Sequence, residues 1–265
     1  MKLNPYIFLA VISFSMVSCE NDFLDRAPDL NLDEEKVFTI YENAQRYHAD
    51  IYSHLVDGFN RLGNFQPVPM SSASDESDSY MGYHGTQTLN FGSYDGVDNH
   101  IFNYYSGIRK ANIFLSKLDV IPFPDESSKN KLTGEVYFLR AFYFFEIIKR
   151  YGGMPIIDDV LIPGDNLMLA RNSFKECVDY ILGDCEEAIN LLPVTLPDNE
   201  LGRATKGAAM ALKARMLLYA ASPLWDLEIT DGNKWQLAAD AAKAVIDLKD
   251  NEGNPAYELY NKGNG

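Results

Sequence analysis

The sequence predicts a mainly all-α protein, a tetratricopeptide-like stack of helix-turn-helix pairs with one long irregular loop region. Apolar residues recur at three- and four-residue spacing along most of the chain, which is the period of an amphipathic helix. Two later segments, 176–193 and 235–250, carry small residues at helical spacing, as the second helices of tetratricopeptide pairs do. With 265 residues, 46% of them hydrophobic, the chain can bury a sizeable core.

The N-terminal residues differ from the rest of the chain. One lysine precedes an apolar run from Tyr6 to Val17, so residues 1–18 are predicted to be a secretory signal peptide. The run ends in MVSC, which resembles a bacterial lipobox and predicts that Cys19 is lipidated. Ordinary secretion with a coincidental cysteine is the alternative. The segment 19–33 is rich in acidic residues and shows no helical period, so it is interpreted as a tether.

Helical periodicity predicts six helices in the remaining chain. They span residues 34–56, 99–118, 128–151, 173–192, 205–221 and 233–248. Ser173 is placed to cap the fourth helix, and Gly152-Gly153 to end the third. The connector between them begins as an extended segment, MPIIDDVLIP. The last four helices therefore pair into two helix-turn-helix units.

The stretch FLRAFYFFEIIKRYGGMP, which begins at Phe138, is apolar around most of its helical circumference. Charged residues interrupt it, and the glycine pair ends it too early for a membrane span. Glu146, Lys149 and Arg150 share one stripe, which leaves the aromatic residues to face neighbouring helices. We predict that this is the central packing helix of the stack.

Charge and cysteine content narrow the class of protein. The formal net charge is −15 and the basic residues do not cluster, so no nucleic acid partner is expected. Cys177 and Cys185 lie in one predicted helix, roughly 12 Å apart at its rise per residue, whereas a disulfide requires less than roughly 7 Å. Both are predicted to be reduced core thiols.

No catalytic or metal-binding motif is present. The chain has no G-x-S-x-G, H-E-x-x-H or C-x-x-C sequence, and its four histidines are dispersed. The loop from Asp226 to Asn233 has its glycine one place late for a calcium-binding EF-hand. We therefore expect no enzyme activity, no metal and no cofactor. A glycosidase that uses two carboxylates from among Asp75, Glu76 and Asp78 is the alternative within the enzyme class.

The irregular region 57–97 is the candidate ligand site, because a loop of this length in a compact domain is either functional or contains a missed element. Its tyrosines offer flat apolar faces for sugar rings, and its acidic and amide side chains offer hydrogen bonds to hydroxyls. The alternative is that the tyrosines only pin the loop to the helices. The predicted ligand contacts are Asp75, Glu76, Tyr80, Tyr83, Tyr94 and Asn99, with Gln87 and Phe91 beside them.

Four stretches resemble the SusD/RagB glycan-binding lipoproteins of the Bacteroidetes outer membrane. These are CENDFLD, YSGIRKANIFL, GEVYFLRAFYFFEIIKRYGGMPII and GRATKGAAMALKARMLLYAASPLW, and the resemblance extends over essentially the whole chain. It implies a cell-surface lipoprotein, anchored to the outer membrane through Cys19. Such a protein captures an oligosaccharide or other nutrient for a TonB-dependent, SusC-like barrel and is not an enzyme.

The chain departs from the family pattern in two respects. Family members run to about twice this length, so the resemblance implies that residues 34–265 are the N-terminal helical domain and that the C-terminal half of the family fold is missing. The family often has a sugar-stacking Trp before YSGIRKAN, where this chain has Ile101 and Phe102, with Tyr94 or Asn99 as the substitute. The alternatives to nutrient capture are a helical scaffold that binds only proteins, or a non-functional truncated fragment.

Overall fold

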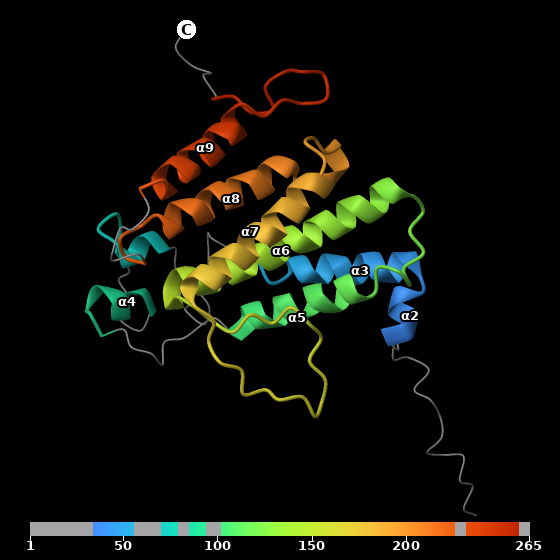
Figure 1. Ribbon diagram of the computed structural model, residues 1–265, viewed down its shortest axis with the longest axis horizontal. Helices are drawn as coiled ribbons and strands as arrows, with labels where there is room; N and C mark the ends of the chain where they lie inside the picture. The colour runs from blue at the N-terminus through green and yellow to red at the C-terminus, as the bar shows by residue number, and fades with distance from the viewer. Residues whose placement is uncertain (1–33, 56–69, 79–84, 94–101, 226–231, 260–265) are drawn as a thin grey trace, which may run out of the picture.

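The computed structural model describes residues 34–55, 70–78, 85–93, 102–225 and 232–259. Within these residues the chain is helical, and the one β contact is an isolated bridge between Lys249 and Pro255. Figure 1 shows the long helices in one stack, with the N-terminal helices at the bottom of the view and α9 at the top. The predicted all-α stack is confirmed.

The predicted helix over 34–56 is two helices, α2 (Glu34–Phe38) and α3 (Tyr41–Tyr52). Ile40 between them is extended, with φ −123° and ψ 120°. The break allows Phe38 to be buried, where its ring packs edge-on against that of Phe114. The apolar period continues across the break, which is why the prediction of a single helix was wrong.

The region predicted to be irregular contains two short helical segments, η2 (Met70–Ala73) and α4 (Gly85–Asn90). They contact each other, and we call residues 70–78 and 85–93 together the η2–α4 unit. Each segment is less than two turns long, too short for an apolar period to be recognised. The following helix, α5 (Phe102–Ser116), lies inside the predicted range 99–118.

Side-chain and glycine caps set the ends of the two longest helices, α6 (Glu126–Tyr151) and α7 (Phe174–Leu191). α6 begins two residues before the predicted Ser128, because Asp125 Oδ1 accepts a hydrogen bond from the Ser128 backbone N–H at 2.7 Å. Gly152 ends α6 with φ 70°, a conformation that favours glycine. Ser173 forms a capping box with Glu176 at the start of α7. The predicted roles of Gly152 and Ser173 are confirmed.

Two further helices, α8 (Lys206–Ala220) and α9 (Lys234–Ile246), complete the stack. A short 3₁₀ turn, η3 (Asp198–Glu200), lies in the connection between α7 and α8. α5 packs against α6, α6 against α7, α7 against α8, and α8 against α9, which is the sequential packing of helical repeats. None of the described helices has the length and apolarity that crossing a membrane requires.

The centre of the core is α6, whose buried residues cover most of its circumference. The Phe145 ring is fully buried and meets the Tyr219 ring edge-on, with centroids 5.1 Å apart. Burial alone would raise the pKa of Glu146, but hydrogen bonds from Lys149 and Arg150 hold that pKa below its usual value. The charged stripe is thus paired, and the predicted central packing helix is confirmed.

Arg140 of α6 and Asp184 of α7 form a buried bidentate ion pair. Arg140 Nε donates to Asp184 Oδ2 at 2.8 Å, and Nη2 donates to Oδ1 at 2.7 Å. The guanidinium also lies over the rings of Tyr137 and Tyr180, at 5.5 Å and 5.2 Å from their centroids. Because an unpaired buried charge is strongly destabilising, this pair fixes how α7 lies on α6.

Both cysteines of α7, Cys177 and Cys185, are free and buried, as the sequence predicted. Cys177 Sγ donates to the Met154 carbonyl at 3.3 Å. Burial raises the pKa of Cys185 to about 12, so its thiol stays protonated at neutral pH and is a poor nucleophile.

We expect Phe145→Ala to lower the free energy of unfolding by about 3–5 kcal/mol, because it leaves a cavity at the centre of the core. Phe91→Ala is the matched control, since that ring is 74% exposed and its loss should change stability by only about 0.5 kcal/mol. Urea unfolding followed by circular dichroism measures both. A loss below about 1 kcal/mol for Phe145→Ala would contradict the central position of α6.

Candidate functional site

Of the predicted ligand contacts, Asp75 and Glu76 fall within the described chain. Both are exposed and follow η2 directly. The predicted contacts Tyr80, Tyr83, Tyr94 and Asn99, and the predicted lipidation site Cys19, lie outside the described residues, as do residues 226–231 of the loop from Asp226 to Asn233. The described residues contain no cluster of His, Cys, Asp or Glu that could hold a metal ion.

Hydrogen bonds between polar side chains and backbone hold the η2–α4 unit together. Gln87 Nε2 donates to Asp78 Oδ1 at 2.6 Å, and Asn90 Nδ2 donates to the Ser72 carbonyl at 2.9 Å. Gln87 is only 4% exposed. The expectation that its amide is presented to a ligand is therefore wrong, because that amide is used to close the unit on itself.

The same unit leaves both polar and apolar groups exposed. Asp75 and Glu76 present carboxylates to solvent, and Phe91, directly after α4, presents a ring that is 74% exposed. Carboxylates that accept hydrogen bonds from hydroxyls, together with a flat apolar face, are the chemistry that binds sugars. Phe91 is thus the described aromatic residue that fits the predicted stacking role.

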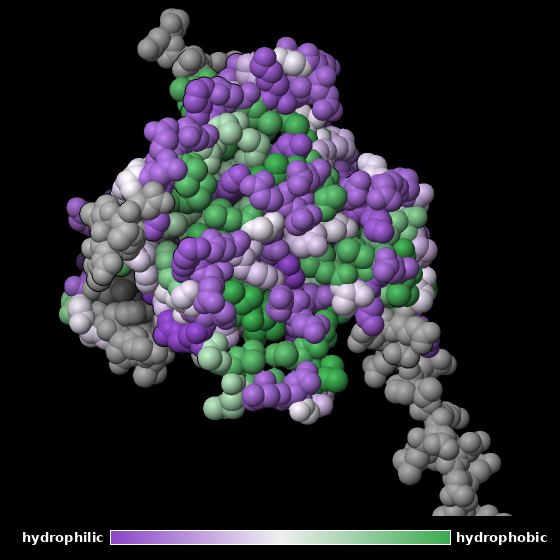
Figure 2. All heavy atoms as spheres, viewed as in Figure 1, coloured by the Kyte–Doolittle hydropathy of each residue, from purple (hydrophilic) through white to green (hydrophobic). Residues whose placement is uncertain are grey.

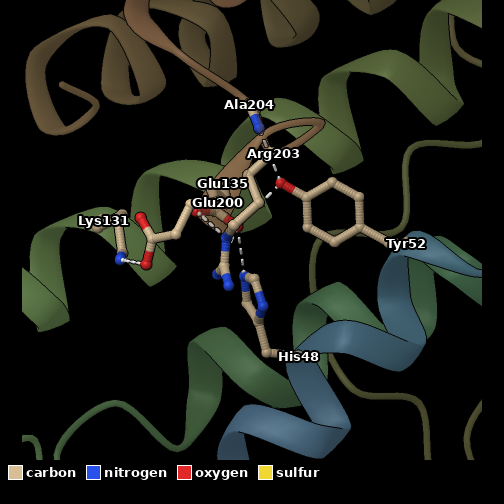
Figure 3. A network of polar contacts seen from close by, with 7 residues as sticks. All are labelled: His48, Tyr52, Lys131, Glu135, Glu200, Arg203 and Ala204. Carbon is tan, nitrogen blue, oxygen red and sulfur yellow. Dashed lines mark hydrogen bonds and ion pairs between the residues drawn. The ribbon is translucent and has the colours of Figure 1, made fainter. Parts of the chain in front are cut away.

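A buried polar network joins α3, α6 and the chain just before α8 (Figure 3). The Glu135 carboxylate accepts from Arg203 through both oxygens, Nε–Oε1 at 2.9 Å and Nη2–Oε2 at 2.8 Å. The Tyr52 hydroxyl donates to Glu135 Oε2 at 2.8 Å and accepts from the Ala204 backbone N–H at 3.1 Å. His48 Nε2 lies 3.4 Å from Glu135 Oε2. Side chains from α3 and from the chain before α8 thus converge on one carboxylate of α6.

Burial controls the protonation of this network. It raises the pKa of Glu135, although hydrogen bonds and charge from Arg203 oppose the rise. It lowers the pKa of His48 to about 3, and the charge of Arg203 adds to that effect. His48 is therefore neutral at physiological pH.

The network forms one wall of a shallow hollow of about 290 Å³, lined by His48, Ala49, Tyr52, Leu201, Gly202 and Arg203. The Glu135 carboxylate behind it is fully buried and already accepts hydrogen bonds on both oxygens. Its lone pairs are engaged in holding the helices together, so it is not a free general acid or base. The network is a structural clamp, and no sequence pattern predicted it.

A second hollow, of about 460 Å³, lies between α7, α8 and α9. Trp225, which follows α8, stacks on Phe174 at the start of α7 with centroids 4.6 Å apart and planes 14° apart. The lining is mainly apolar and also includes Lys175 and Lys234. The sequence did not predict this groove, and its only signal there is Trp225, which follows Pro223 just after the predicted helix 205–221.

The lowered pKa of His48 predicts an acid-sensitive fold. Between pH 6.5 and about 3 the unfolded chain binds a proton at His48 that the folded chain does not, so stability falls as pH falls. The expected slope is at most about 1.4 kcal/mol per pH unit. His48→Gln should flatten the decline between pH 6.5 and about 4.5, above the range in which ordinary carboxyls titrate.

Urea unfolding of both proteins at several pH values measures this slope. The raised pKa of Glu135 acts in the opposite sense, because protonation of its carboxyl favours the folded state, and it is present in both proteins. His54→Gln is the comparison: His54 also has a lowered pKa but is only partly buried, so this variant should flatten the decline less than His48→Gln does. If the free energy of unfolding falls with pH equally steeply in wild type and His48→Gln, His48 is not a source of the acid sensitivity.

The sequence was compared with protein families and curated proteins. The family model described as "Starch-binding associating with outer membrane" matches residues 22–218. A SusD-like protein of Formosa agariphila is 25% identical over 228 residues, which are 80% of this chain and 41% of that protein. A SusD-like protein of Bacteroides ovatus is 23% identical, over 81% of this chain and 39% of that protein. The chain thus spans about two fifths of the length of these relatives.

Solved structures of similar fold are known. A SusD-like protein of Bacteroides fragilis is 30% identical and superposes with a TM-score of 0.65, over 86% of this chain and 41% of that one. A laminarin binding SusD-like protein is 24% identical with a TM-score of 0.66, over 82% of this chain and 46% of that one. Since the family model also matches most of the chain, this protein belongs to the SusD-like family.

Proposed function

We propose that this protein is a cell-surface glycan-binding lipoprotein that captures an oligosaccharide for import through a TonB-dependent, SusC-like outer-membrane barrel. Membership of the SusD-like family carries this proposal, because the description of the matching family combines starch binding with association with the outer membrane. One structure of similar fold is that of a laminarin binding protein. Glycan binding by this chain and its partnership with the barrel are parts of the proposal.

The glycan site we propose is the η2–α4 unit with its flanking residues. Asp75 and Glu76 are exposed hydrogen-bonding groups, and Phe91 is an exposed stacking surface. Hydrogen bonds such as that between Gln87 and Asp78 hold the unit in one shape, which lowers the ordering cost of binding. Tyr80, Tyr83, Tyr94 and Asn99 complete the proposed set of contacts.

We further propose that the protein binds its ligand without catalysis and without a cofactor. A glycosidase requires a carboxylic acid whose pKa is raised by an apolar environment, beside a second, ionised carboxylate. Asp75 and Glu76 are both exposed. Glu135 is buried, but it is bound to Arg203 and Tyr52. The described residues thus support a binding role.

The glycan proposal is tested by native gel electrophoresis in the presence of polysaccharides such as starch and laminarin. We expect the chain from residue 20 onward to be retarded by its ligand. Replacing Tyr80, Tyr83 or Tyr94 by Ala should each weaken binding about 2- to 10-fold, the loss expected for one stacking ring. Trp235→Ala is the control, since this ring lies on α9 and is 48% exposed.

The outcomes distinguish an error in the proposed contact residues from an error in the proposed glycan binding. Retardation that is equal in wild type and in all three tyrosine variants would contradict the proposed contacts and leave glycan binding intact. Migration unaffected by every polysaccharide tested would contradict glycan binding itself. Release of reducing sugar from the retarding polysaccharide would contradict the absence of catalysis.

The lipid anchor is tested at Cys19. We expect the full-length wild-type chain, expressed in a Gram-negative host, to incorporate labelled palmitate and to fractionate with the outer membrane. Cys19→Ala should lose the label and leave the membrane fraction, because the thiol that carries the lipid is gone. Cys185→Ala is the control. Equal labelling of the Cys19→Ala variant would contradict the lipobox assignment.

A further inference from the structure

The connector between α6 and α7 carries exposed apolar side chains on a projecting loop, residues 158–169. Figure 1 shows this loop extending beyond α5 at the bottom of the view, and Figure 2 shows apolar surface there. The exposed fractions are 61% for Ile162, 68% for Leu167, 89% for Met168 and 41% for Leu169. Single exposed apolar residues are ordinary, whereas a contiguous group of them marks an interaction site.

Side chains of α5 hold the base of the projecting loop. Arg109 Nη1 donates to the Leu161 carbonyl at 2.6 Å. Asn112 Nδ2 donates to the carbonyls of Ile157 at 2.8 Å and Asp159 at 3.2 Å. These bonds satisfy the backbone of an extended segment that has no neighbouring strand.

Asn112 is itself held from the core. It is 3% exposed, and its Oδ1 accepts from Arg140 Nη1 at 2.9 Å. Arg140 in turn forms the buried bidentate pair with Asp184 of α7. A continuous chain of hydrogen bonds therefore runs from α7 through α6 and α5 to the base of the loop.

The tip of the loop also has a defined shape. The Ile162 backbone N–H donates to Asp165 Oδ2 at 2.7 Å, and the Asp165 N–H donates to the Ile162 carbonyl at 3.1 Å. Gly164, inside this turn, has φ 108°, which favours glycine. Asn166 Oδ1 accepts from the Met168 N–H at 3.0 Å. The apolar side chains are thus presented by a preformed loop, and binding them loses little conformational entropy.

The charge of the loop selects the kind of partner. Asp158, Asp159 and Asp165 are exposed on it, and the chain as a whole carries a formal charge of −15. An anionic membrane surface would repel these carboxylates. A protein surface with an apolar recess and basic side chains around it would attract them and bury the apolar residues.

We propose that the projecting loop docks into an apolar recess, bordered by basic side chains, on the outer-membrane barrel partner. The inference rests on the proposed function for the identity of that partner. It adds the surface of this chain that makes the contact and the chemistry of the complementary surface.

The test measures binding of the full-length chain to a purified SusC-like transporter. Leu167→Ser/Met168→Ser removes apolar surface without adding charge, and should weaken binding about tenfold or more. Leu218→Ser/Ile246→Ser is the matched control, since these residues are 49% and 72% exposed on α8 and α9, and it should bind as wild type does. Asp158→Lys should slow association at low salt and lose this effect at high salt.

The outcomes test the loop contact, the barrel partnership and glycan binding separately. If wild type and Leu167→Ser/Met168→Ser bind the transporter equally, the loop inference is wrong and the partnership stands. If wild type does not bind the transporter but is retarded by a polysaccharide, both the partnership and the loop inference are wrong and glycan binding stands. If the Cys19→Ala chain floats with phosphatidylglycerol vesicles and the loop variant does not, the loop binds lipid and the inference is wrong.

Discussion

The burial of α6 is the constraint on which the rest of this structure depends. The helix contacts α3, α5, α7 and α8, and its buried residues cover most of its circumference. A helix that is apolar around most of its circumference cannot lie on a surface, so neighbours must cover it from several sides. The hydrophobic effect that drives this covering is not directional. The hydrophobic effect therefore stabilises the stack but does not determine which helix packs against which part of α6.

Two charged residues buried within α6 determine how the neighbouring helices are placed on it. Glu135 requires Arg203 and Tyr52, and so fixes α3 and the approach to α8. Arg140 requires Asp184, and so fixes α7. Removing one partner of such a pair leaves an uncompensated buried charge, which costs far more than the pair itself contributes. The alternative packings that apolar surface alone would permit are thereby disfavoured.

The sequence was sufficient for what is decided locally. The caps at Ser173 and Gly152 depend on residues within one turn, and the central role of α6 follows from its own apolar circumference. The break before α3 was not predictable in this way, because Phe38 leaves the helical path in order to meet Phe114, a residue far along the chain. The link between Glu135 and Arg203 crosses 68 residues, and no local pattern reports it.

In the candidate site, too, some features follow from local sequence and others from contacts between distant segments. Sequence patterning predicted a polar and aromatic region, since composition alone reveals which chemical groups a segment carries. It could not tell which polar groups remain free, and Gln87 shows why: its amide bonds to Asp78 only because α4 folds back on the segment after η2. Exposure at Asp75 and burial at Gln87 are consequences of that small fold and not of residue type.

The chain of bonds from Asp184 through Arg140 to Asn112 means that one set of buried groups supports both the stack and the projecting loop. The side chains at its tip have the opposite character, since Met168 is 89% exposed and touches little of the fold. Substitution at the tip therefore changes what the loop can bind and leaves stability almost unaffected, whereas substitution at Asn112 or Arg140 changes both. Recognition can vary on this scaffold because the groups that contact a partner are separate from the groups that hold the loop in place.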